Sequence, residues 1–155
     1  MKKRIRLIVA ILAVTGGSAL ISCSRDSTRS FADKFIEAEN KAWSTGSLED
    51  LKALEHTNVV YHLPGNDLVG WKAHEDFILQ GRPTVSNLRQ TWKYLSGEGN
   101  HFALSYDSSA LVRGNGTDLS MEVSNSYLFV FRLEDGRIAE VWTNGTTTSK
   151  PTEAR

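Results

Sequence analysis

The stretch from Trp43 to Gly70, WSTGSLEDLKALEHTNVVYHLPGNDLVG, decides the fold of this 155-residue chain. Gly46 is predicted to end one helix, and Ser47 is predicted to cap a second, short helix. The β-branched and aromatic run Asn58–Leu63 predicts a strand, which turns back at Pro64–Gly65. The stretch therefore predicts the entry corner of a small, cone-shaped α+β domain whose interior is a pocket.

The first 22 residues have the pattern of a secretory signal peptide. A cationic start with Lys2, Lys3, Arg4 and Arg6 precedes an apolar run that is short for a membrane span. The run ends in Leu20-Ile21-Ser22-Cys23, which resembles the lipobox of bacterial lipoproteins. Removal of the signal peptide would leave the cysteine as a lipidated N-terminus.

Cys23 is the only cysteine of the chain, so the domain has no internal disulfide. Acyl chains on Cys23 would hold the protein on a membrane, because each buried methylene contributes about 0.8 kcal/mol. Residues 23–30 are expected to form the lipidated cysteine and a polar tether. The protein is therefore expected to be lipid-anchored in the cell envelope. Ser24 follows the cysteine in place of an aspartate, which resembles the outer-membrane sorting signal of Gram-negative lipoproteins and predicts an outer-membrane protein that faces the periplasm if the host is Gram-negative.

Loss of residues 1–22 makes the chain mildly acidic. It removes four basic residues and leaves 14 Lys and Arg against 18 Asp and Glu. This balance argues against a nucleic-acid partner, since proteins that bind nucleic-acid phosphates need clustered positive charge. The remaining residues are enough to form a core without disulfides.

The folded domain is predicted to span residues 31–148, with a frayed tail at 149–155. Apolar residues recur at helical spacing from Phe31, with Ser30 as the expected cap, and Gly70-Trp71 begins a third helix that runs to Gln80. The chain from Thr84 to Thr148 is predicted to be strand and turn throughout. Helices followed by long strands predict an α+β fold, in which a curved antiparallel sheet wraps around N-terminal helices.

Alternation along the strands leaves two phases open for the strand that ends near Phe131. In one phase Asn125, Tyr127 and Phe129 face the interior of the cone. In the other phase Glu122, Ser124 and Ser126 face inward, and the aromatic side chains form a homodimer surface on the sheet.

The motifs resemble the nuclear transport factor 2-like superfamily, in particular its SnoaL-like branch, over Phe31 to Thr148. The resemblance is carried by the residues from Trp43 to Glu49, by Val59-Val60-Tyr61-His62 with Pro64 and Gly70 after them, and by Phe131 to Ile138 before Trp142. It implies a cystatin-like α+β barrel. The superfamily includes isomerases, cyclases, dehydratases and hydrolases as well as catalytically silent binding domains.

The ketosteroid isomerases of this superfamily imply three catalytic positions, and the chain departs from all of them. Leu63 stands where their general-base aspartate is expected, and Glu39 stands where their tyrosine is expected. Leu128 or Phe129 stands in place of the aspartate that stabilises the oxyanion. Isomerase chemistry of that type is therefore not expected.

His62 is the candidate general base, because its side chain titrates near neutrality and follows the strand at the corner. Only one of Tyr61 and His62 can point into the cone, since a strand alternates its faces. The residues predicted to line the pocket are aromatic or polar. They are Tyr61, Trp71, His74, Tyr106, Asn125, Tyr127, Trp142 and Asn144.

No zinc-ligand spacing, nucleotide-binding loop or hydrolase nucleophile motif is found in the sequence, so no metal and no cofactor are expected. The favoured hypothesis is a lipid-anchored module that binds a small apolar molecule in the cone or a partner on its sheet. The alternative is a hydrolase, lyase or isomerase that acts on a cyclic or polyketide-like substrate with His62 as base. A purely structural envelope protein with a filled cone is a third hypothesis.

Overall fold

The computed structural model describes residues 19–113 and 120–152, and the side chains from Ser27 onward. The described residues form three α-helices, one 3-10 turn and six β-strands. The elements are α1 (Ala19–Thr45), α2 (Glu49–Leu54), β1 (Glu55–Leu63), β2 (Asn66–Val69), α3 (Trp71–Gly81), η1 (Arg82–Thr84), β3 (Val85–Glu98), β4 (His101–Arg113), β5 (Ser120–Glu134) and β6 (Arg137–Pro151). None of the described helices is long and apolar enough to cross a bilayer.

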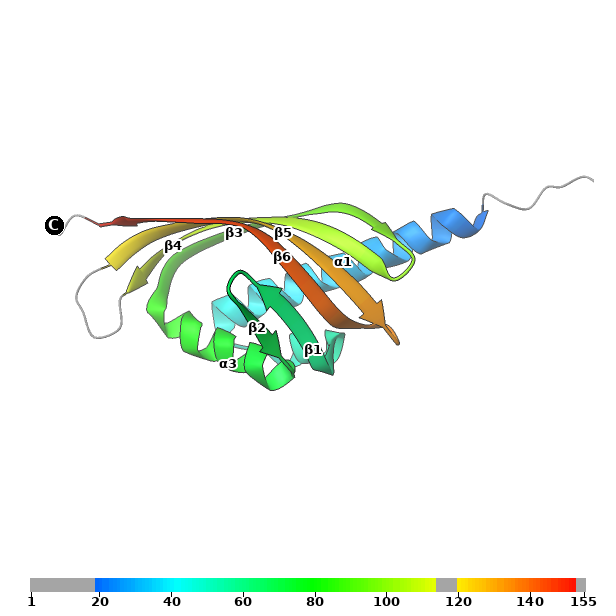
Figure 1. Cartoon of the computed structure of the whole chain (residues 1–155), viewed down its shortest axis with the longest axis horizontal. Helices are drawn as coiled ribbons and strands as arrows, with labels where there is room; N and C mark the ends of the chain where they lie inside the picture. Colours follow the sequence, from blue (N-terminus) through cyan, green and yellow to red (C-terminus); the bar gives the residue numbers. More distant parts are fainter. Residues whose placement is uncertain (1–18, 114–119, 153–155) are drawn as a thin grey trace, which may run out of the picture.

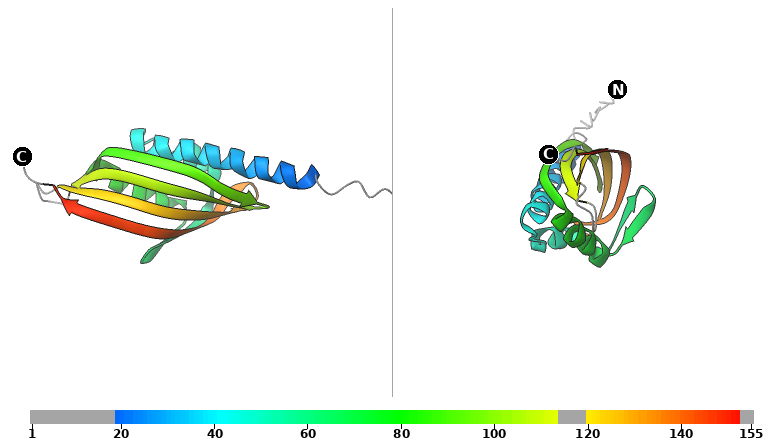
Figure 2. Two further views of the ribbon diagram at one scale, coloured as in Figure 1. Left: turned by 90° about the horizontal axis from the view of Figure 1, so that it is seen from above. Right: turned by 90° about the vertical axis from the view of Figure 1, so that its left-hand side faces the viewer.

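The six strands form one curved sheet in the order β2-β1-β6-β5-β4-β3. It bends around α1 and α3, and the end-on view shows the helices and the β1–β2 hairpin closing the hollow of the sheet (Figures 1 and 2). The predicted α+β class is confirmed. One pair departs from the antiparallel prediction, because β1 and β6 run parallel. They come from opposite ends of the domain, and the chain between them provides the long crossover that a parallel pair requires.

The helix α1 begins at Ala19, before the start predicted at Phe31, so the predicted polar tether is part of this helix from Ser24 to Ser30. Tertiary packing accounts for the extension from Thr28 onward. Thr28 is buried, and its hydroxyl lies 3.0 Å from the hydroxyl of Tyr94 on β3. Thr28, Ala32 and Phe35 face the sheet at helical spacing, which extends the buried stripe by one turn ahead of the sequence-based start.

The corner that the sequence predicts is present, with differences at the helix ends. Gly46 ends α1 with a φ of 83°, and its backbone N–H donates to the Ala42 carbonyl, as the prediction of a glycine stop requires. Ser47 does not cap α2, which begins one residue later than predicted and has no side-chain cap. β1 and β2 are joined at Pro64–Gly65, where Gly65 has a φ of 97°.

The long strands take the first of the two predicted phases. Val123, Asn125 and Tyr127 are partly buried on the inner face of β5, whereas Ser124 and Ser126 are exposed. The phase that points the polar residues inward is therefore wrong. The physical reason is that Phe129 and Phe131 continue the inner face into the core, and a strand places alternate residues on one face.

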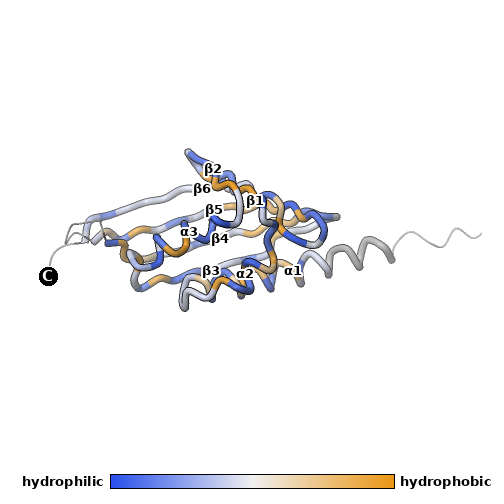
Figure 3. Tube along the Cα trace, turned by 90° about the horizontal axis from the view of Figure 1, so that it is seen from below, coloured by the Kyte–Doolittle hydropathy of each residue, from blue (hydrophilic) through white to orange (hydrophobic). Residues whose placement is uncertain are grey.

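The core lies between α1 and the inner face of the sheet. Phe35 packs against Phe131, with ring centroids 4.8 Å apart, and Phe131 stacks on Phe102 at 4.4 Å. Figure 3 shows hydrophobic positions alternating with hydrophilic ones along the strands and on α3. Gly114-Asn115-Gly116, a sequence that predicts a hairpin turn, lies outside the described residues. β6 pairs with β5 as far as Pro151, so the first part of the tail predicted to fray is strand.

Candidate functional site

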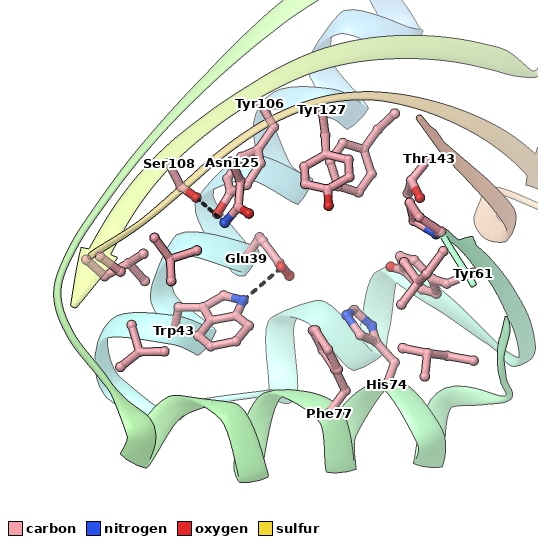
Figure 4. A pocket seen from close by; sticks show the side chains of 18 of the residues that line it. Glu39, Trp43, Tyr61, His74, Phe77, Tyr106, Ser108, Asn125, Tyr127 and Thr143 are labelled. Atoms are coloured by element: carbon pink, nitrogen blue, oxygen red, sulfur yellow. Dashed lines mark hydrogen bonds between the residues drawn. The ribbon is translucent and has the colours of Figure 1, made fainter. Parts of the chain in front are cut away.

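A cavity of about 380 Å³ lies between α1, α3, the β1–β2 hairpin and the inner face of the sheet. Figure 4 shows its labelled side chains converging on one space from these elements. Its walls are mainly apolar and aromatic, with a few polar groups. The lining residues are Phe35, Glu39, Trp43, Tyr61, Leu63, Pro64, Asn66, Leu68, His74, Phe77, Val85, Leu88, Trp92, Tyr106, Ser108, Ala110, Val112, Val123, Asn125, Tyr127, Phe129 and Thr143.

The helix α1 contributes Phe35, Glu39 and Trp43, which share one face because they are four residues apart. Glu39 is 8% exposed, and its Oε1 accepts a hydrogen bond of 3.0 Å from the indole N–H of Trp43. Its other oxygen, Oε2, is buried and has no hydrogen-bond partner among the described residues. Figure 4 shows the carboxyl group pointing into the space between α1 and α3.

A second polar cluster joins β1 to α3. The side chain of Glu55 is fully buried, and its carboxylate lies 3.1 and 3.2 Å from Nδ1 of His74. The hydroxyl of Tyr61 donates to Glu55 Oε1 at 2.5 Å. The rings of Tyr61 and His74 also pack together, with centroids 4.2 Å apart. Glu55 therefore orients both side chains at the wall of the cavity.

Burial and pairing shift the pKa values of these groups. Burial raises the pKa of Glu39, and the nearby charge of His74 only partly opposes this effect. Burial alone would lower the pKa of His74, but the hydrogen bond and the charge of Glu55 outweigh it and the pKa is raised. His74 can thus hold a proton against Glu55, whereas Glu39 has no comparable counter-charge.

The wall opposite α1 carries a hydrogen-bonded amide. Asn125 donates to the Ser108 hydroxyl at 3.0 Å and accepts from Thr147 at 2.8 Å. The hydroxyls of Tyr127 and Thr147 lie 2.7 Å apart, which continues this chain of contacts. Asn125 was predicted as an inward-facing amide that needs partners, and these contacts supply them.

The structure places the sequence-predicted pocket residues in two groups. Tyr61, His74, Tyr106, Asn125 and Tyr127 line the cavity together. The other three predicted residues, Trp71, Trp142 and Asn144, do not line the cavity.

Trp71 is in the core at 7% exposure, where its ring packs edge-on against His74, and it is not among the residues that line the cavity. Trp142 and Asn144 were placed on the wrong face of β6. Val141 is buried and Thr143 lines the cavity, so Trp142 and Asn144 must point outward. Trp142 is 38% exposed on the outer face of the sheet, where the predicted pairing of two copies stays a prediction.

His62 faces outward, so its predicted role as the general base of the cavity is wrong. Its Nε2 lies 3.0 Å from Glu140 and its Nδ1 lies 3.2 Å from Asp67. The ring stacks on Trp142 with centroids 5.8 Å apart. The hydrogen bond that His62 donates to Glu140 raises the pKa of His62. The cause of the error is strand alternation, because β1 turns Tyr61 inward.

Two functional candidates were not predicted from the sequence: Glu39, which lines the cavity, and Glu55, which holds two of the lining side chains. Glu39 could have been found, because it falls midway between Phe35 and Trp43 on the apolar stripe of α1. Glu55 shares its strand face with Tyr61. However, it follows directly on α2, and no sequence pattern showed that the strand begins there.

Within residues 19–113 and 120–152, no group of three or more His, Cys, Asp or Glu side chains could hold a metal ion. The main features of the cavity are its aromatic walls, the carboxyl group of Glu39 and the pair that His74 forms with Glu55. Such a cavity inside a cone of sheet and helices defines the class of small α+β pocket proteins.

The chain belongs to the family of the SnoaL-like domain, whose model matches residues 33–141. The resemblance inferred from the sequence is thereby confirmed. The family comprises ligand-binding and enzymatic proteins. No curated protein matches the chain in sequence.

Solved structures with the same fold have low sequence identity. A hexachlorocyclohexane dehydrochlorinase, LinA-type3 from Novosphingobium barchaimii LL02, matches with a TM-score of 0.66 and 10% identity, over 86% of this chain and 96% of that one. A putative ketosteroid isomerase from Kribbella flavida DSM 17836 matches with a TM-score of 0.58 and 20% identity, over 88% of this chain and 89% of that one. AclR, a putative hydroxylase from Streptomyces galilaeus, matches with a TM-score of 0.62 and 16% identity, over 79% of this chain and 91% of that one. These likenesses show the fold.

Proposed function

We propose that this protein binds a small, mainly apolar molecule inside its cone. The observation that carries the proposal is the cavity of about 380 Å³, which lies within the usual size range of small-molecule sites. Its aromatic and aliphatic walls suit an apolar body, and Glu39, His74 and Asn125 offer a few convergent polar contacts. A cone filled with side chains, as the purely structural hypothesis requires, does not agree with this cavity.

Binding in the cavity is testable with the neutral fluorescent probe N-phenyl-1-naphthylamine. We expect its fluorescence to rise on binding, and Ala110→Phe to weaken the affinity by about tenfold or more, because Ala110 lines the cavity and the added ring fills it. Fluorescence titration gives the Kd of each variant.

The matched control is Ser124→Phe, which adds a ring on the exposed face of the neighbouring strand β5. It should bind the probe as the wild type does. If Ala110→Phe, shown to be folded by circular dichroism, also keeps the wild-type Kd, the probe binds elsewhere and the proposal fails.

Proton transfer to or from the bound molecule is a second candidate function. The observation that favours it is the pair of His74 with Glu55 at the cavity wall. Glu55 holds Nδ1, and no described residue forms a hydrogen bond with Nε2, so that nitrogen is available to a ligand. This candidate replaces the enzyme hypothesis based on His62, and it requires that the pKa of His74 depends on Glu55.

We further propose that the protein is anchored in the cell envelope through lipid on Cys23, and on the outer membrane if the host is Gram-negative. The proposal is supported by the signal-peptide pattern, the lipobox-like end and the single cysteine. Cys23 belongs to the first turns of α1, which in Figure 1 project past the end of the sheet. A lipid there would leave the cone clear of the bilayer.

Substitution Cys23→Ser is expected to move the protein from the membrane fraction to the soluble fraction, because no acyl chain can then be attached. Fractionation of cells that express each form, followed by immunoblotting, measures the shift. Ser22→Ala, which keeps the cysteine, is the control and should stay with the membrane. A Cys23→Ser protein that remains membrane-bound after a high-salt wash would contradict the anchor.

A further inference from the structure

We propose that the molecule held in the cone carries an ammonium group, which sits against Glu39 between aromatic rings. This inference rests on the proposed binding function and names the chemical class of the ligand. It follows from the unpaired carboxyl oxygen of Glu39, the aromatic walls around it and the charges of the lining.

The first observation is that Glu39 is buried with half of its hydrogen-bonding capacity unused. Oε1 accepts from Trp43, whereas Oε2 has no partner among the described residues. Buried polar atoms in proteins are normally paired, and an unpaired carboxylate is especially costly. On a cavity wall, the missing partner of this oxygen can be supplied by a ligand that brings a hydrogen-bond donor or a positive charge.

The second observation is the composition of the walls next to Glu39. Phe35 and Trp43 flank it on α1, and Phe77 packs edge-on against Trp43, with ring centroids 6.1 Å apart. Trp92 and Tyr106 form a further aromatic pair at 4.2 Å. Cations bind favourably over the faces of such rings, and the attraction grows when water is excluded.

The third observation concerns charge. No lysine or arginine is found among the residues that the structure describes around the cavity. His74 is the one basic side chain in that lining, and it is already paired with Glu55. An ionised Glu39 therefore lacks a counter-charge of its own, and an ammonium group would supply it.

A neutral ligand with an oxygen acceptor is the competing chemistry, because burial raises the pKa of Glu39 and a protonated carboxyl can donate. The indole N–H of Trp92, which has no partner in the described part of the chain either, needs an acceptor and cannot bind an ammonium group. Two features favour the cation at Glu39. The hydrogen bond from Trp43 stabilises the ionised carboxylate, and the aromatic faces beside it attract positive charge.

The test compares 1-aminoadamantane with 1-adamantanol, which share one apolar cage and differ in an ammonium or a hydroxyl group. Isothermal titration calorimetry at pH 7 gives both Kd values. We expect the amine to bind about tenfold or more tightly than the alcohol. The substitution Glu39→Gln should remove this preference by weakening the amine while leaving the alcohol nearly unchanged.

Glu37→Gln is the matched control, since it makes the same change of charge on the exposed face of α1. It should keep the preference for the amine. Thermal unfolding verifies that the Glu39→Gln protein is folded, as expected for a variant that loses only a desolvated carboxyl group.

Equal binding of the two probes to the wild type, or tighter binding of the alcohol, overturns the ammonium inference. It is also overturned if neither probe binds while N-phenyl-1-naphthylamine does, although the proposed function then stands. If the naphthylamine probe does not bind either, the proposed function fails as well.

Discussion

Replacing Glu55 with alanine is expected to lower the free energy of unfolding by about 3–5 kcal/mol, the usual cost of breaking a buried ion pair. The carboxylate is fully buried and binds both His74 and Tyr61. Its removal leaves an imidazolium and a hydroxyl without their partner inside the protein. Urea denaturation at pH 6 measures the loss. The exposed Glu98, at the end of β3, provides the control, and Glu98→Ala should change stability by about 0.5 kcal/mol or less.

The pair of His74 with Glu55 makes the loss of unfolding free energy on substitution of Glu55 depend on pH. The folded-state pKa of His74 lies above its ordinary value of 6.5, so the contribution of the pair is complete below that value and is lost as the pH rises through the folded-state pKa. The conservative substitution Glu55→Gln should therefore destabilise the protein more at pH 6 than at pH 9.

Nuclear magnetic resonance of His74 provides a direct readout of the pair. Its pKa should fall in Glu55→Gln, because burial then acts without the carboxylate. A pKa of His74 that is the same in both proteins would contradict the pairing and remove the basis for proton transfer in the cavity.

Truncation of Phe131 to alanine is expected to cost about 3–5 kcal/mol of unfolding free energy. The side chain is 0% exposed, and its ring contacts both Phe35 and Phe102 in the core. A cavity left there cannot close fully, because the surrounding rings belong to α1 and to a neighbouring strand. Urea denaturation, with the slope checked against the wild type, measures the loss.

Trp142→Ala is the informative comparison, because this larger aromatic residue lies on the outer face of the sheet. It loses the stacking on His62 and some surface contact, which corresponds to about 1 kcal/mol. Losses of equal size for Phe131→Ala and Trp142→Ala, or a larger loss for Trp142→Ala, would contradict the inward phase of β5 and the outward position of Trp142.

Local patterns predicted most of the architecture. Gly46 and the Pro64–Gly65 turn could be identified because glycine readily adopts the positive φ that Gly46 and Gly65 have, and because proline fixes its own φ. The inner face of β5, with Tyr127 and Phe129, was one of two phases that alternation left open.

The candidate site was less predictable, because its groups come from separate elements. Glu39, Glu55 and His74 lie on α1, β1 and α3, and no spacing along the chain joins them. The buried face of α1 extends to Thr28, whose hydroxyl contacts Tyr94 on β3, and a helical pattern cannot show this contact.

The sequence by itself determined most of the elements and the α+β class, because these follow from backbone preferences and residue types. Only the tertiary structure decided that Tyr61 faces the cavity and His62 faces outward, since a strand pattern gives two faces without saying which is inside. It also decided that Oε2 of Glu39 has no partner among the described residues, while Glu55 pairs with His74. Those pairings depend on distances between elements, and distances exist only once the chain has folded.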